Sequence, residues 1–121
     1  MNIEQYRNYC ISKKGVTEHF PFDEDVLVFK VMGKMFALSS LKKWEEETPS
    51  VNLKCDPDRA LELRAEYEAV QPGYHMNKQL WNTVSINQDV SDEMIYNLID
   101  HSYDLIVAGL TKKLQAELAN L

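Results

Sequence analysis

Two runs of strand-forming residues, separated by a short glycine-containing link, constrain the fold of this chain more than any other feature. Residues 26–32 are rich in β-branched and aromatic side chains, and residues 35–38 continue the apolar character. Gly33-Lys34 lies between the two runs, and such a link between strand-like runs is a strong signal for a β-hairpin. The chain is therefore expected to contain antiparallel β-structure.

Further strands and several helices are expected around this hairpin. Residues 50–55 and 81–86 alternate apolar and polar side chains, which is typical of strands with one buried face. Asn2, Asp56 and Ser91 are suitable helix N-caps. The corresponding helices, with a short terminal one after Gly109, are expected over 3–14, 57–67, 92–108 and 110–118.

The second of these helices is expected to bury Ala60, Leu61 and Leu63. The order helix, hairpin, strand, helix, strand or strands, helix, helix predicts an α+β fold. We expect a two-layer sandwich, in which an antiparallel sheet packs with one face against the N- and C-terminal helices. A chain of 121 residues supports one hydrophobic core, so residues 1–121 are expected to form one domain.

Composition narrows the setting in which the protein works. No apolar run approaches the roughly 20 residues that cross a bilayer, and the first ten residues are too polar for a signal peptide. We therefore expect a cytoplasmic protein without a membrane partner. Cys10 and Cys55 are far apart in the sequence and belong to no paired motif, so both are expected to be buried, reduced thiols.

Residues 72–78 form the densest group of potential binding side chains in the chain. Pro72-Gly73 is a turn signal, and Tyr74, His75, Asn77 and Lys78 follow within five residues. Turns require glycine and proline, but they do not require this set of polar and aromatic groups. A loop of this kind, held by the strand that begins at Trp81, indicates a contact surface.

Charge is segregated along a chain whose net charge is −6. Residues 26–44 and 69–88 contain five lysines and no acidic residue, so all 19 acidic residues lie elsewhere. Acidic residues have low β-propensity, which is one sufficient explanation. The alternative is that the hairpin and the 70–82 loop form a weakly positive face suited to a phosphate backbone.

The sequence resembles the MmcQ/YjbR family, small bacterial proteins described as DNA-binding with a double-wing arrangement. The matching blocks cover nearly the whole chain, from Ile3 to Leu118. They are Phe29-Lys30-Val31, Gly33-Lys34, Phe36-Ala37-Leu38, Leu53-Lys54-Cys55-Asp56-Pro57, Leu63-Arg64, Pro72-Gly73-Tyr74-His75-Met76-Asn77-Lys78, Trp81-Asn82 and Ser102-Tyr103-Asp104-Leu105-Ile106. The resemblance implies a CyaY-like fold, which agrees with the predicted element order, and a nucleic-acid role.

These observations give two sets of candidate residues. The candidate nucleic-acid contacts, drawn from the acid-free stretches, are Lys30, Lys34, Lys42, Lys43, His75, Asn77 and Lys78. The residues expected to build the motif and lock its loop, partly by a helix-to-loop hydrogen bond, are Pro72, Gly73, Tyr74, Trp81, Ser102, Tyr103 and Asp104. Solvated lysines at strand edges and a purely structural polar loop are the plainer alternatives.

Enzymatic chemistry is not expected. Ser102, Asp104 and His75 are residue types of a catalytic triad, but no nucleophile elbow or oxyanion-hole glycine run accompanies them. His19 and His101 lack metal-ligand spacing, and no nucleotide- or metal-binding motif occurs, so no metal or cofactor is expected.

Two functional hypotheses remain. The first is weak DNA binding, mostly insensitive to sequence, because the candidate face carries lysines but no arginine to read guanine. The second is a non-enzymatic module that binds a protein or small molecule through the Tyr74-His75-Asn77 loop.

Overall fold

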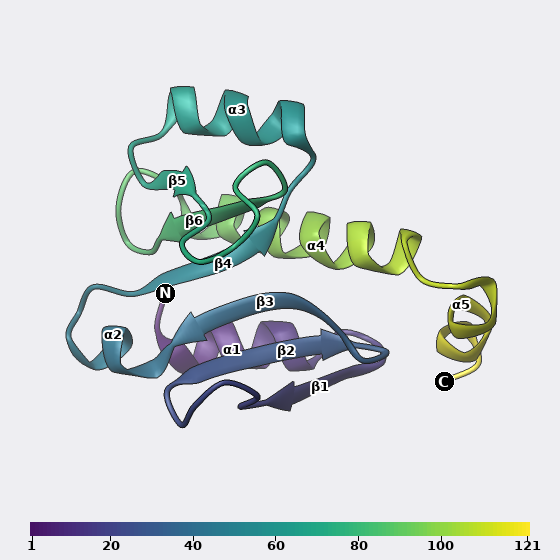
Figure 1. The fold of residues 1–121 in the computed structure, drawn as a ribbon. Helices are drawn as coiled ribbons and strands as arrows, with labels where there is room; N and C mark the ends of the chain where they lie inside the picture. Colours follow the sequence, from purple (N-terminus) through teal and green to yellow (C-terminus); the bar gives the residue numbers. More distant parts are fainter.

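The computed structural model describes residues 1–121 as a six-stranded antiparallel sheet with helices on one face (Figure 1). The strands lie in the order β1-β2-β3-β4-β6-β5. In Figure 1, α1 and α4 lie behind the sheet and the face toward the viewer is free of helices. The elements are α1 (Ile3–Ile11), β1 (Val16–His19), β2 (Val26–Val31), β3 (Lys34–Ser40), α2 (Leu41–Glu45), β4 (Ser50–Lys54), α3 (Pro57–Glu66), β5 (Val70–Pro72), β6 (Trp81–Ser85), α4 (Asp92–Ala108) and α5 (Lys112–Ala119). This arrangement confirms the predicted α+β sandwich.

The β2–β3 hairpin forms where the sequence predicts it, with Gly33 at φ +83° in the turn. A register shift occurs in this ladder, because Phe29 pairs with Ala37 while Lys30 pairs with Met35. Phe36 is thus an extra residue in β3, as in a β-bulge. The bulge allows the consecutive residues Phe36 and Ala37 both to join the main core.

The two faces of the sheet differ in what they bury. The main core lies between the sheet and the helices and includes Tyr6, Phe29 and Ile99, all fully buried. On the open face, Val28, Leu38 and Trp81 form a smaller buried cluster. The sheet therefore has a helix-covered face and an outer face, and the residues that alternate with the core positions point to the latter.

Ser102 on α4 joins β3 to β4 instead of locking the motif loop. Only two residue pairs link these strands in register. Beyond them the Ser102 hydroxyl donates to the Phe36 carbonyl at 2.5 Å and accepts from the Lys54 amide at 2.9 Å. Ser102 is fully buried, so its hydroxyl satisfies two backbone groups that the ladder leaves open.

The expected helix-to-loop hydrogen bond is also absent for the two residues that follow Ser102. The Tyr103 hydroxyl donates to the Lys14 carbonyl at 2.6 Å and so holds the turn after α1. Asp104 is exposed on α4 and makes no hydrogen bond or ion pair. The expectation that these side chains fix residues 72–78 was wrong, because α4 covers the opposite face of the sheet.

Helix caps confirm three predicted starts, whereas the terminal helix α5, expected from residue 110, begins at Lys112 after the cap Thr111, and one core assignment was wrong. Asn2, Asp56 and Ser91 each accept a hydrogen bond from a backbone amide in the first turn of their helix. On α3, Ala60 and Leu63 are buried as predicted, whereas Leu61 is 62% exposed. The helical period decides this, because Leu61 lies about 100° around the helix from Ala60.

Both cysteines are free and buried, as predicted. Burial raises the pKa of the Cys10 thiol to about 12, so the thiol stays protonated at neutral pH and the reactive thiolate is hardly populated. None of the helices is both long and apolar enough to cross a bilayer.

Candidate functional site

The turn at Gly73 brings the motif loop against β6 at a distance that only glycine permits. The Gly73 amide donates to the Trp81 carbonyl at 2.8 Å. A Cβ atom on residue 73 would lie 2.8 Å from the Trp81 Cβ and 2.9 Å from the Trp81 carbonyl oxygen. Real Cβ atoms do not approach this closely, so the glycine is needed for the close backbone approach.

Lys78 and Asn77 hold the shape of the loop. The Lys78 ammonium donates to the Gly73 carbonyl at 3.0 Å. The Asn77 side chain accepts from the Gln79 amide at 3.0 Å, and its carbonyl accepts from the Trp81 amide at 2.9 Å. Both residues were expected to contact nucleic acid, but the Lys78 ammonium and the Asn77 side-chain oxygen are bonded within the loop.

Arg64 anchors the end of this loop from α3. Its Nε donates to the Asn82 side chain at 2.7 Å, and its terminal nitrogen donates to the carbonyls of Trp81, at 3.2 Å, and Lys78. The planar guanidinium reaches these three acceptors at once, which an ammonium could not do. Arg64 was not among the predicted site residues, although it belongs to one of the matching family blocks.

Thr83 and Asn52 hold the backbone of Tyr74 from the sheet. The Tyr74 amide donates to the Thr83 hydroxyl at 2.9 Å, and that hydroxyl donates to the Asn52 side chain at 2.5 Å. Both side chains belong to the outer face, where Asn52 pairs with Thr83 in the β4–β6 ladder. Sequence reasoning missed them because they bind the backbone of Tyr74 across the fold: Thr83 accepts from its amide, nine residues away, and Asn52 donates to its carbonyl, 22 residues away.

Tyr74 and His75 are displayed by this scaffold rather than used in it. Tyr74 is 69% exposed, and its ring lies 4.0 Å from the His75 ring between centroids. His75 has φ +58°, a conformation that costs free energy for any residue with a Cβ atom. Neither side chain makes a hydrogen bond within the chain, so both rings are available for a ligand.

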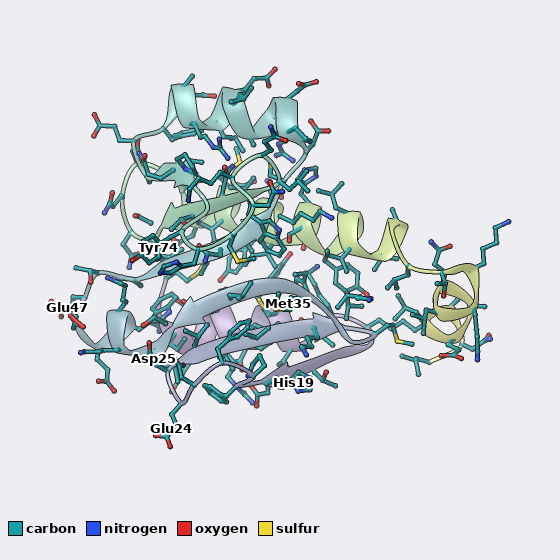
Figure 2. All side chains as sticks on the ribbon, in the orientation of Figure 1. His19, Glu24, Asp25, Met35, Glu47 and Tyr74 are labelled. Carbon is teal, nitrogen blue, oxygen red and sulfur yellow. The ribbon has the colours of Figure 1, made fainter.

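These rings form one wall of a groove over the outer face of the sheet. The groove has a volume of about 490 Å³. Phe22 and Asp23, from the segment before β2, form the opposite wall. In Figure 2, Tyr74 and Asp25 lie at the same end of the sheet, on opposite sides of β3. The remaining lining residues are Asp25, Val26, Leu38, Ser39, Ser40, Lys43, Ser50, Asn52, Met76 and Thr83.

Asp25 organises the wall opposite Tyr74. Its carboxylate accepts from the Ser40 hydroxyl at 2.6 Å and from the Lys42 amide at 2.7 Å. These hydrogen bonds, that from Ser40 foremost, lower the pKa of Asp25, and the charges of Lys42 and Lys43 add to the effect. Asp25 thus ties the segment before β2 to the start of α2.

The candidate lysines do not gather on one surface. Lys30 and Lys34 lie beside the β2–β3 turn, whereas Lys42 and Lys43 lie on α2, at the other end of β3. At about 3.3 Å per residue, the length of β3 separates the two pairs by roughly 20 Å. Lys43 lines the groove, and the ammonium of Lys78 is bound to the loop.

Trp81 belongs to neither the main core nor the exposed surface. It packs on the outer face with Val28 and Leu38, and Met76 and Leu80 of the motif loop cover this cluster. Its exposed fraction of 9% confirms that it is largely buried. The motif loop is therefore fixed by apolar packing as well as by hydrogen bonds.

The other histidines take structural positions. His101 accepts a hydrogen bond from the Asp56 amide at 3.1 Å, and desolvation, with the charge of Arg59, lowers its pKa. His19 bonds to Thr17 within β1. No group of three or more His, Cys, Asp or Glu side chains is arranged to hold a metal ion.

The fold defines a class: α+β sandwiches in which an antiparallel sheet has helices on one face and an open second face. Solved structures share this fold. Protein DR2400 of Deinococcus radiodurans superposes with a TM-score of 0.88 at 35% identity, covering 98% of this chain and 88% of that one. The Pseudomonas syringae protein PsR293 gives a TM-score of 0.72 at 26% identity, covering 87% and 98%.

Sequence comparison gives the family. The YjbR family model matches residues 11–105. The uncharacterised protein YjbR of Escherichia coli K12 is 33% identical over 121 residues, which is 100% of both chains. The uncharacterised protein YbdF of Escherichia coli O157:H7 is 40% identical over 94 residues, covering 78% of this chain and 75% of its own. The chain belongs to the YjbR family, as the resemblance implied.

Proposed function

We propose that this protein is a non-enzymatic binding module whose ligand occupies the groove between Phe22-Asp23 and Tyr74-His75-Met76. One observation carries the proposal. Arg64, Lys78, Asn77, Thr83 and Asn52 all hold a loop that displays two aromatic rings, one of them on a backbone of positive φ. Strained, well-supported backbone of this kind is concentrated at ligand sites.

The size and composition of the groove support the same conclusion. A volume of about 490 Å³ lies within the range of small-ligand pockets, roughly 300–1,000 Å³. Five of its 14 lining residues are apolar and the others are polar or charged, so the groove offers apolar contact together with many hydrogen-bonding groups. His75 makes no hydrogen bond with a hydroxyl or thiol, which favours binding over nucleophilic catalysis.

The test is NMR mapping of a mixed fragment library on the ¹⁵N-labelled protein. Fragments that bind should shift the backbone amides of Asn52, Tyr74 and Thr83, and the shifts should disappear in Tyr74→Ala/His75→Ala. Leu61→Ala, which removes an exposed apolar side chain of similar exposure on α3, is the control and should change nothing. Fragments that bind only elsewhere, or equally well to the double variant, would contradict the proposal.

DNA contact is the second candidate, and one placement favours it. Lys30 and Lys54 both lie on the outer face near its β2–β3 turn end, where Lys30 pairs with Met35 and Lys54 with Trp81. Lys54 was not among the predicted contacts. A phosphate backbone crossing this end would meet lysines and avoid the acidic segment before β2. Such contacts position a backbone and would give weak binding with little sequence preference.

A further inference from the structure

We infer that the groove takes a zwitterionic ligand of amino-acid size with an aromatic side group, and this inference rests on the proposed function. The ligand's ring would lie between Phe22 and Tyr74, and its two charges would face Lys43 and Asp23.

The lining of the groove carries charges of both signs that form no ion pair within the chain. Lys43 lines the groove and takes part in none of the ion pairs of the structure, and its ammonium makes no hydrogen bond. Asp23 uses one carboxylate oxygen to accept from the amides of Asp25 and Val26, at 2.9 and 2.8 Å. Its second oxygen has no partner.

Lys43 of α2 and Asp23 of the segment before β2 line the same groove. The Asp23 carboxylate accepts a hydrogen bond from the Asp25 amide, and the charge of Lys43 contributes to lowering the pKa of Asp25. An α-amino acid carries an ammonium and a carboxylate on the same carbon atom. Its carboxylate can bind the Lys43 ammonium while its ammonium binds the Asp23 carboxylate. Hydrogen bonds between charged groups are about twice as strong as neutral ones. Lys43 and Asp23 should therefore favour a ligand that carries both a carboxylate and an ammonium group.

The aromatic walls supply the other half of the match. Phe22 is 63% exposed and Tyr74 is 69% exposed, although both line the same groove. Large exposed aromatic side chains in a recess mark a recognition surface. Val26, Leu38 and Met76 add an apolar floor, so the groove offers an aromatic ring contact on both sides and beneath.

The charge of the surrounding segment excludes a polyanionic occupant. Residues 23–25 are all acidic, and in Figure 2 Glu24 points away from the body of the protein while Asp25 points toward it. Three negative charges beside the groove repel a chain of phosphates, but they do not repel a ligand without net charge. The zwitterion is therefore the better electrostatic match.

The test uses four probes in NMR titrations of the full chain: L-phenylalanine, 3-phenylpropanoate, 2-phenylethylamine and glycine. The last three lack the ammonium, the carboxylate and the ring in turn. L-phenylalanine should shift Asn52, Tyr74 and Thr83, and each of the other probes should bind at least about tenfold more weakly, since each loses one class of contact.

Matched variants assign the contacts. Asp23→Asn keeps the acceptor for the two backbone amides but removes the charge. It should weaken the binding of L-phenylalanine about tenfold while leaving the binding of 3-phenylpropanoate unchanged. Lys43→Gln should weaken 3-phenylpropanoate as well. Lys42→Gln, next in the chain but outside the groove lining, is the control and should have little effect.

Equal binding of the phenyl analogues and L-phenylalanine would overturn the inference, as would tighter binding of adenosine monophosphate. Absence of any shift with L-phenylalanine would also overturn it. In that case fragments that still bind in the groove would support the proposed function without the inference about its ligand. Fragments that bind only elsewhere would contradict both the proposed function and the inference.

Discussion

The Lys78 ammonium donates a hydrogen bond to the Gly73 carbonyl oxygen at 3.0 Å and thereby closes the loop that carries Tyr74 and His75. The two residues are five positions apart, and the side chain of one binds the backbone of the other. A lysine in this loop therefore has a structural task, and the charge that it adds to the surface is partly shielded by the carbonyl dipole.

Gly73→Ala should destabilise the fold by about 1–3 kcal/mol, because the added methyl group meets Trp81 at less than van der Waals distance. Chemical denaturation measures the effect. Gly109→Ala is the matched control: its Cβ would be no closer than 3.6 Å to other atoms, and its backbone is in the right-handed helical region. That variant should be neutral or gain up to about 1 kcal/mol, and an equal loss in both variants would contradict the close-approach argument.

Arg64→Lys should cost about 1–2 kcal/mol although it keeps the charge, because an ammonium cannot reach Asn82 and the carbonyls of Lys78 and Trp81 together. Amide exchange at Leu80 and Trp81 should accelerate more than exchange in β2. Arg59→Lys on the same helix, whose side chain makes no hydrogen bond, should leave both quantities unchanged. Equal behaviour of the two variants would show that Arg64 does not anchor the loop.

His75→Gly should separate stability from binding. A left-handed conformation costs a non-glycine residue about 1–2 kcal/mol, and the greater chain entropy of glycine offsets about 0.5–1 kcal/mol of the relief. The free energy of unfolding should therefore stay constant or rise by up to about 1 kcal/mol, while groove binding weakens. A variant that loses stability would mean that the imidazole supports the fold.

The stability of the protein should fall as the pH drops below about 6.5. In the folded chain, His101 accepts a hydrogen bond through a ring nitrogen that must be unprotonated, and desolvation lowers its pKa. The unfolded chain has the ordinary pKa of about 6.5 and binds the proton more readily. The contribution is thus fully present above about pH 6.5 and is lost as the pH falls toward the lowered pKa. Denaturation midpoints between pH 7.5 and 5 should show this slope, and His101→Gln should flatten it.

DNA binding, where it occurs, should depend only moderately on salt. On the sheet and α2, the lysines with free ammonium groups are Lys30, Lys34, Lys42, Lys43 and Lys54, so log K should fall against log salt with a slope no steeper than about −4.5. Lys30→Glu/Lys34→Glu should lower the affinity for DNA measured in a binding titration. Lys112→Glu/Lys113→Glu, which changes the net charge equally on α5, should weaken it less. Equal losses in both variants would exclude the hairpin as a contact.

Local patterns in the sequence were sufficient to predict the hairpin and the helix starts. The run from Val26 to Leu38 and the caps Asn2, Asp56 and Ser91 act through neighbouring residues, so their effect can be predicted from order alone. β1 and α2 were missed because they are too short to show such local patterns. β1 exposes three of its four residues and offers no alternating pattern. It forms because its backbone pairs with β2.

The candidate site was predictable in position but not in the roles of its residues. The density of side chains in residues 72–78 indicated a contact surface at this loop, but Tyr74, predicted to help build the motif, exposes its ring beside His75. The use of Lys78 and Arg64 as internal supports depends on acceptors that the folded backbone presents, and no periodicity encodes these. Phe22 and Asp23 approach the loop only because the sheet order places β2 two strands from β4.

The seam at Ser102 gives the sheet a mechanical division. β1, β2 and β3 form one group of strands and β4, β6 and β5 form the other, and the junction between β3 and β4 has two residue pairs in register with the hydroxyls of Ser102 and Ser39 on either side of them. The wall with Phe22 grows from the first group and the wall with Tyr74 from the second. Because the two walls of the groove belong to different groups of strands, its width depends on how β3 and β4 are held together, and Ser102 of α4, on the far side of the sheet, takes part in holding them.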